Sequence, residues 1–253
     1  MRAYMAFNKK EWTENLRTYR FFIMGIVFLL FGMMNPIVAK YTPALIEAIA
    51  PEMGLHLPEP TMLDSWVQFF KNIGQMGLLI LVIVFGGTMA NELNRGTLIN
   101  MLTKGLKRST VILSKFTMAT ILWTICYALN LAVTYVYTAY FWDINGMHHA
   151  FLAFFSLWFF GVLLISLVIL GGVFFKNTYG SLLFTGGAVV MMTLLNISPK
   201  LHKYNPITLS FDNMSLLTAQ KAAADFLPAL VICAALVVLL IVLSVVTFNK
   251  KQL

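Results

Sequence analysis

Six long stretches of this sequence contain almost no charged residue, and they constrain the fold more than any other feature. An α-helix rises about 1.5 Å per residue, so about 20 apolar residues cross a hydrocarbon core of about 30 Å. Only 11% of the 253 residues are charged and 59% are hydrophobic, whereas soluble domains have about 25% charged residues. The sequence therefore predicts an all-α polytopic membrane protein, a single domain with transmembrane helices at residues 21–39, 70–90, 111–137, 150–175, 179–197 and 226–248.

Residues 1–20 combine charged residues with apolar residues at near-helical spacing, namely Met5, Trp12, Leu16 and Tyr19. This pattern predicts an amphipathic helix in the membrane interface, which serves either as a simple anchor or as a lever touching a cytoplasmic partner. A signal peptide is not expected, because some twenty residues that include Glu11 and Glu14 precede the first apolar run and no small-residue cleavage site follows it.

The distribution of basic residues predicts the orientation of the chain. Cytoplasmic loops of membrane proteins carry an excess of Lys and Arg. With the N-terminus inside, the inner segments hold most of the 18 basic residues, and the outer segments hold most of the 10 acidic ones. Both termini are therefore expected on the cytoplasmic side of a bacterial plasma membrane. The net charge of +8 is interpreted as a signal of this orientation and not of nucleic-acid binding. The inner basic residues are Arg2, Lys9, Lys10, Arg17, Arg20, Arg95, Lys104, Lys107, Arg108, Lys115, Lys176, Lys250 and Lys251.

The inner loop at residues 91–110 contains signals for a short helix. Thr97 is suited to the N-cap, Lys104 to the last turn and Gly105 to a left-handed stop. A helix of about two turns is marginal alone, so its apolar side chains need either the membrane surface or a groove on a protein. Those side chains are Leu98, Ile99, Met101 and Leu102.

The same loop resembles the cytoplasmic loop of ABC-2-type transporter permeases. The resemblance lies in Glu92, Arg95-Gly96-Thr97, Leu102, Lys104-Gly105, Arg108 and Ser114-Lys115, and in Lys10-Glu11 with Leu16-Arg17 before the first span. It implies a coupling helix that docks on a separate ABC ATPase subunit, which would bind ATP and Mg while this chain holds no cofactor. The implied docking residues are Glu92, Arg95, Gly96, Thr97, Leu98, Ile99, Met101, Leu102, Lys104 and Arg108.

The resemblance further implies an exporter subunit that pairs with a second permease, as a homodimer or a heterodimer, surrounded by membrane lipids. The chain has no P-loop and no hydrolase motif, so we expect no enzymatic activity of its own and neither catalytic nor metal-binding residues. No ionisable residue is expected deep in a span, which fits an external motor and an amphiphilic or apolar cargo such as a peptide, an antimicrobial or a lipid-like molecule.

Eight residues, six inside the spans and two in the loop before the last span, are candidates for the transport pathway or for its gates. Polar residues in transmembrane helices more often make helix–helix hydrogen bonds, which is the other interpretation of this set. Outside the spans, a Pro-rich loop is expected at residues 40–66. A short helix is expected at residues 214–224, within the loop before the last span. The resemblance implies that this loop helps to shape the outer gate. The candidates are Asn35, Pro36, Gln75, Thr88, Asn130, Thr134, Asn205 and Pro206.

Two other functions are left open by the sequence. One is a non-transporting immunity or sensor subunit within an ABC assembly. The other is a membrane enzyme using His148, His149 and Asp143 at the outer face, although adjacent histidines do not share a helix face. Cys126 and Cys233 lie in apolar runs and are expected to be packing residues.

Overall fold

The computed structural model describes residues 2–49 and 58–251. Within these ranges the chain forms helices and no β-strand, and six helical segments are long and apolar enough to cross a membrane. The predicted all-α fold with six transmembrane helices is therefore confirmed.

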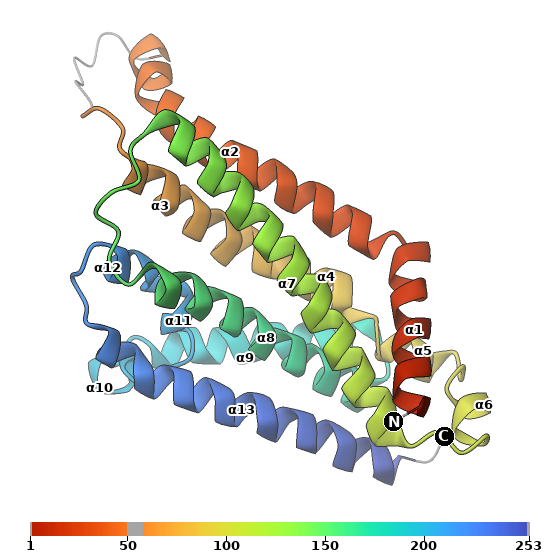
Figure 1. The fold of residues 1–253 in the computed structure, drawn as a ribbon. Coiled ribbons are helices and arrows are strands. Elements are labelled where there is room, and N and C mark those ends of the chain that lie inside the picture. Colours follow the sequence, from red (N-terminus) through yellow and green to blue (C-terminus); the bar gives the residue numbers. More distant parts are fainter. Residues whose placement is uncertain (1, 50–57, 252–253) are drawn as a thin grey trace.

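The helices follow one another through the bundle as Figure 1 shows. The second membrane crossing is composite, because a π-helical turn interrupts it and shorter helices continue it. The elements are α1 (Arg2–Arg17), α2 (Arg20–Ile49), α3 (Met62–Asn72), η2 (Ile73–Gly77), α4 (Leu78–Gly86), α5 (Ala90–Asn94), α6 (Ile99–Leu102), α7 (Arg108–Phe141), α8 (Ala150–Phe175), α9 (Thr178–Leu195), α10 (Pro199–His202), α11 (Thr208–Phe211), α12 (Asn213–Leu217) and α13 (Ala223–Lys250).

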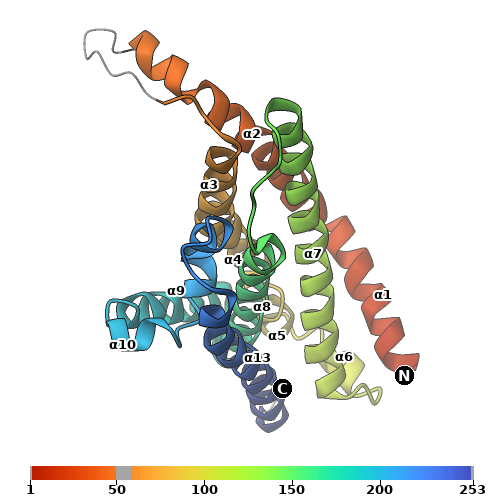
Figure 2. The same cartoon turned by 60° about the vertical axis from the view of Figure 1, so that its left-hand side comes forward.

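Helix α8 is the centre of the bundle, and α9 lies at its periphery. Of the most apolar stretch of α8, 72% is buried, against 11% for α9. Helices α4, α7, α9 and α13 all pack on α8, whereas α2, α3 and α7 form a second group of packed helices. Both views show these two groups, with α4 reaching between them (Figures 1 and 2).

The packing of α2 on α7 is close because Gly32 has no side chain. A Cβ atom at Gly32 would lie 2.9 Å from the Cβ atom of Val133 and 3.0 Å from the carbonyl oxygen of Asn130. The Asn130 amide donates a 2.5 Å hydrogen bond to the carbonyl oxygen of Phe28. Small residues and polar bonds of this kind hold helices together in lipid, where apolar burial does not favour one helix contact over another.

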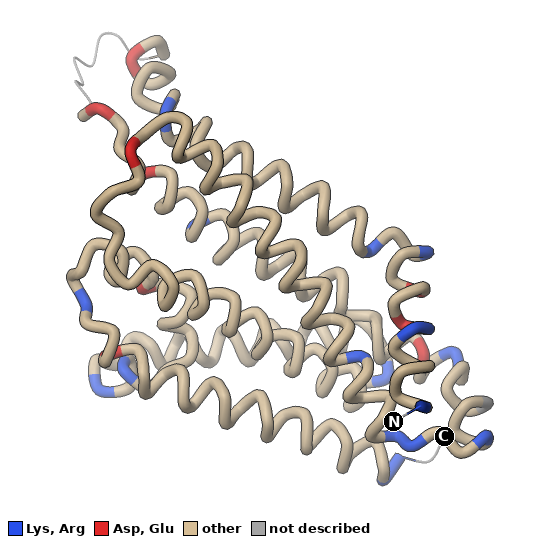
Figure 3. Tube along the Cα trace, in the orientation of Figure 1, with Lys and Arg blue, Asp and Glu red and all other residues tan. Residues whose placement is uncertain are grey.

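Charged residues divide between the two ends of the bundle (Figure 3). Lys and Arg gather at the end where both termini lie, which we call the basic end. Most Asp and Glu lie at the opposite end. The exceptions at the basic end are Glu11, Glu14 and Glu92, which form the site described below.

Two predictions about the segments at the opposite end were wrong. The expected loop 40–66 is shorter, because α2 continues through Pro43 to Ile49 and α3 begins at Met62 behind a capping box formed by Thr61 and Asp64. Residues 50–57 of that loop lie outside the described residues. The expected helix 214–224 ends at Leu217 instead, because the backbone turns into a left-handed conformation just after it.

The contact between α2 and α7 generates a paired prediction. We expect Gly32→Ala to lower stability by about 1–3 kcal/mol, since the added methyl group would overpack against the α7 backbone. Gly25→Ala in the same helix is the control, because a Cβ atom there meets nothing within 4 Å. Thermal unfolding in detergent should therefore separate the two variants, and equal effects would contradict this packing.

Candidate functional site

Lys115 is a lysine buried inside the basic end of the bundle. It lies in the second turn of α7, and its side chain is 0% exposed. Its Nζ atom lies 2.9 Å from Oε1 of Glu11 in α1 and 2.9 Å from Oε2 of Glu92 in α5. One ammonium group therefore joins three helices that are far apart in the sequence.

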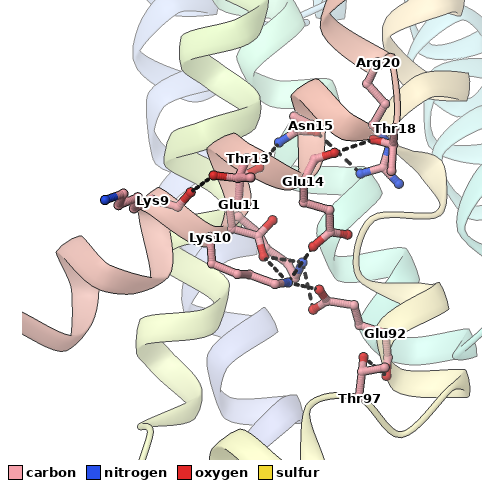
Figure 4. A network of polar contacts seen from close by, with 11 residues as sticks. Lys9, Lys10, Glu11, Thr13, Glu14, Asn15, Thr18, Arg20, Glu92 and Thr97 are labelled. Atoms are coloured by element: carbon pink, nitrogen blue, oxygen red, sulfur yellow. Dashed lines mark hydrogen bonds and ion pairs between the residues drawn. The ribbon is translucent and has the colours of Figure 1, made fainter.

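Lys10 closes the same cluster from the more exposed side. Its Nζ atom lies 3.0 Å from Oε1 of Glu11 and 2.6 Å from Oε2 of Glu14, and it also pairs with Glu92. Figure 4 shows the carboxylates of Glu11, Glu14 and Glu92 converging on the ammonium group of Lys10. We call these five residues the charge network: Lys10, Glu11, Glu14, Glu92 and Lys115.

The charges of the network are nearly balanced, as burial requires. A buried ion whose partner is missing costs several kcal/mol, so each ammonium group depends on the carboxylates around it. Burial alone would lower the pKa of Lys10, but the carboxylates of Glu11, Glu14 and Glu92 outweigh it and hold that pKa above its ordinary value. Burial likewise favours a higher pKa for Glu14, but Lys10, with Lys115 and Arg20, lowers that pKa. Both shifts favour the charged forms near neutral pH.

Helix α1 presents Glu11 to the bundle because of its helical period. Phe7, Glu11 and Asn15 recur every four residues and form the buried face of α1. The Asn15 amide donates a 2.9 Å hydrogen bond to the carbonyl oxygen of Glu11. Tyr4 adds a second tie to α7, since its hydroxyl lies 2.8 Å from Oγ1 of Thr117. Helix α1 is therefore fixed on α7 by polar contacts.

Sequence reasoning did not identify this network as a site. The sequence places Lys115 among the inner basic residues and Glu11 in the helix before the first span, and it predicts no contact between them. The available signal was the four-residue spacing that places Glu11 on the same face as Phe7 and Asn15. A carboxylate on the packed face of an interfacial helix requires a buried cation, and Lys115 is the cation that the start of α7 supplies.

Three of the residues implied to dock on an ATPase have side chains that contact other parts of this chain. Glu92 belongs to the charge network, and Leu98 is 1% exposed and packs in the core. The Arg108 guanidinium donates to the carbonyl oxygens of Asn249, at 3.0 Å, and Lys251, at 2.7 Å. Each of these three side chains has contacts within the chain, and its role in docking stays a prediction.

The loop helix is shorter than the sequence predicts. Helix α6 has four residues and begins at Ile99. The residue in the N-cap position is therefore Leu98 and not Thr97. The Thr97 hydroxyl instead donates a 3.3 Å hydrogen bond to the carbonyl oxygen of Glu92. Gly105 is left-handed, with φ at +90°, as its assignment to a helix stop predicts.

The remaining loop residues differ in exposure. Of the four apolar side chains, only Ile99 is exposed, at 40%, whereas Met101 and Leu102 are half-buried against the core. Arg95 and Lys104 are exposed, and Gly96 is left-handed, with φ at +65°. The outward surface of this loop is therefore smaller and more basic than the sequence suggests.

Most of the predicted pathway residues make helix–helix or local hydrogen bonds. The Asn35 amide donates to Oγ1 of Thr134 at 3.0 Å, and Asn72 donates to Oδ1 of Asn35 at 2.8 Å. Together with the bond from Asn130 to the backbone of α2, these contacts form a buried polar seam between α2, α3 and α7.

The other candidates are hydrogen-bonded or buried, except Gln75. Thr88 donates to the carbonyl oxygen of Phe85, and Asn205 donates to that of Met192 at the end of α9. Pro36 and Pro206 are buried. Gln75 is exposed and lines a cavity between α4 and α9.

That cavity, which we call the lateral cavity, has a volume of about 440 Å³. Its walls are η2 with α4 on one side and α9 on the other, and Phe160 and Leu164 of α8 line it as well. The lining is apolar except for Gln75, Thr185 and Ser210. A π-helical turn such as η2 adds a residue to the helical ladder, and such turns are frequent at functional sites.

Among the described residues, the acidic groups of the network have the arrangement most similar to a metal-binding site. Atoms of Glu11, Glu14 and Glu92 lie within 4.8 Å of one another. Lys10 pairs with all three, so an ammonium group already occupies the position between them. Among the described residues, His148, His149 and Asp143 belong to no such group, and the backbone N–H of His148 bonds to the carbonyl oxygen of Leu217.

Comparison with known proteins supports the membrane assignment. The chain is 21% identical over 140 residues to the uncharacterized transmembrane protein YxlG of Bacillus subtilis (strain 168). The match covers 54% of this chain and 54% of the relative, so the chain spans about half the length of that relative. No family model matches the sequence. The protein is thus a multi-pass membrane protein with a transmembrane relative.

The network generates a prediction about Lys115. We expect Lys115→Met to lower the free energy of unfolding by about 3–5 kcal/mol, because Glu11 would be left buried without its closest partner. The double variant Glu11→Gln/Lys115→Met should regain part of that loss, since it removes both buried charges.

Unfolding in mixed detergent micelles measures both variants, and Lys107→Met, an exposed lysine just before α7, is the control. An equal loss in Lys115→Met and Lys107→Met would contradict the structural role of the network. Strict additivity in the double variant would show that Glu11 and Lys115 do not interact.

Proposed function

We propose that the chain is the transmembrane permease subunit of an ATP-driven ABC exporter. The observation that carries the proposal is the charge network, which fixes the loop at residues 91–107 to α1 and α7 through Glu92 and Lys115. A force applied to this loop would be passed to two helices at once. The resemblance of the loop to ABC-2 permeases implies that the force would come from a separate ATPase subunit that binds ATP and Mg.

The orientation follows from the charge distribution. Lys and Arg gather at the basic end, and this is the end that the positive-inside rule places in the cytoplasm. Both termini and the loop would then face the ATPase, in a bacterial plasma membrane. The exposed tip of the loop, formed by Ile99 and Lys104, is the docking surface we propose in place of the longer set implied by the sequence.

The lateral cavity supports an amphiphilic or apolar cargo. It is apolar, carries a few polar groups and lies between α4 and the peripheral helix α9. Helix α9 also exposes Gly186 and Gly187, where an added Cβ atom would meet nothing within 4 Å. A second permease, identical or related, would cover this face and enclose a pathway between the two subunits.

The docking proposal predicts that the loop tip controls association with the ATPase. We expect Ile99→Asp to weaken association by about 2 kcal/mol, as for a central interface residue, and Lys104→Glu to weaken it through charge reversal. Co-purification of the ATPase from native membranes measures both effects. Lys176→Glu is the control, since Lys176 is an exposed lysine in the neighbouring loop.

If a well-folded wild-type protein brings down no ATPase, the exporter assignment fails. Full retention of the ATPase by both tip variants would show that docking uses another surface.

A further inference from the structure

A second cavity lies at the basic end, beside the charge network. It has a volume of about 330 Å³ and is bounded by α1 and its corner to α2, by the junction of α4 and α5, and by the loop before α6. This volume falls within the range of about 300–1,000 Å³ that is usual for small-molecule pockets. We call it the corner cavity.

Two arginines line the corner cavity and keep unused donors. Among the described residues, Arg20 donates to the Asn15 amide oxygen at 3.5 Å and its charge also acts on Glu14, whereas Arg95 extends from the loop. Within residues 2–49 and 58–251, neither arginine lies within ion-pair distance of a carboxylate. The two carboxylates that line the cavity, Glu14 and Glu92, are already paired with Lys10.

The charge balance of the cavity wall therefore favours an anion. Lys10 and the two arginines bring three positive charges, whereas Glu14 and Glu92 bring two negative ones. Guanidinium groups bind phosphate oxygens through paired hydrogen bonds, which makes arginine well suited to this ligand. Because both carboxylates are engaged, they are poor partners for the ammonium group of a zwitterionic headgroup.

The cavity also lies at the membrane surface. Arg20 is the first residue of α2, the first spanning helix, and Tyr19 just before it is 67% exposed. Phe22 and Ile23, which follow, are 49% and 52% exposed and would face acyl chains. Aromatic residues next to basic ones mark the headgroup level, and basic pockets between transmembrane helices are a known form of lipid headgroup site.

We propose that the corner cavity binds the phosphate headgroup of an anionic phospholipid, through Arg20 and Arg95. The lipid would bridge the start of α2 and the loop before α6, next to the charge network. Its binding does not depend on the proposed ATPase, because every residue involved belongs to this chain.

The test is native mass spectrometry of the purified full chain in detergent, titrated with phosphatidylglycerol, with phosphatidylcholine or with inorganic phosphate. We expect one phosphatidylglycerol to be retained in preference to phosphatidylcholine, and Arg20→Gln/Arg95→Gln to weaken its binding by more than about tenfold. Arg2→Gln/Lys250→Gln is the matched control, since it removes two exposed charges from the same end.

Each alternative outcome has a definite meaning. Equal weakening in both double variants would overturn the site, because it would reflect only the general charge of the surface. Equal retention of phosphatidylcholine would overturn the anionic preference, and displacement by inorganic phosphate would reassign the cavity to a soluble phosphate. Arg20→Lys/Arg95→Lys keeps both charges but loses the paired hydrogen bonds, so it should bind the lipid more tightly than the glutamine variant and less tightly than the unchanged protein. A lysine variant that binds no more tightly than the glutamine variant would overturn the part assigned to the two positive charges.

Discussion

The ion pair between Lys115 and two carboxylates is the interaction on which the basic end of the structure depends. Lys115 and Glu11 are both almost fully buried, so each charge depends on the opposite charges around it. Glu92 extends the pair into the second crossing, and Lys10 closes the cluster toward the surface. Helix α1, the start of α7 and the loop before α6 thus form one unit, although lipid-facing helices have little apolar preference for one another.

This unit organises the features around it. The loop tip projects from it, and the corner cavity lies along its α1 side. The end of α13 is bound close to this unit. The Arg108 guanidinium donates to carbonyl oxygens at the end of α13, and the Lys251 ammonium group donates to the carbonyl oxygen of Phe174 in α8. The lateral cavity lies farther along the bundle, between α4 and α9. A displacement of the loop would therefore reach the spanning helices through charged contacts at several points.

The sequence predicts the membrane-spanning fold well and the candidate site poorly, for different physical reasons. A span is a local property, since each helix must satisfy its own backbone in lipid and shield it with apolar side chains. Helix α2 continues beyond residue 40 with mostly exposed side chains, although Pro43 lies inside it. The short α6 follows the buried Leu98, whose burial against the core no local pattern specifies. The burial of Glu11 depends on where Lys115 lies, and these residues are joined only by tertiary structure. For the same reason Leu98 and Arg108 were predicted to face outward, whereas each has a partner within the chain.

The central claim is that the charge network holds α1 and the loop as one rigid unit. The most direct test is the distance distribution between spin labels at Met5 on α1 and Lys104 on the loop, both of which are exposed. Cys126 and Cys233 are buried, so labelling of cysteines introduced at these positions would be selective. The account predicts one narrow distribution in the otherwise unchanged protein and a broad one after Lys115→Met. A broad distribution in both proteins, or an identical narrow one, would contradict it.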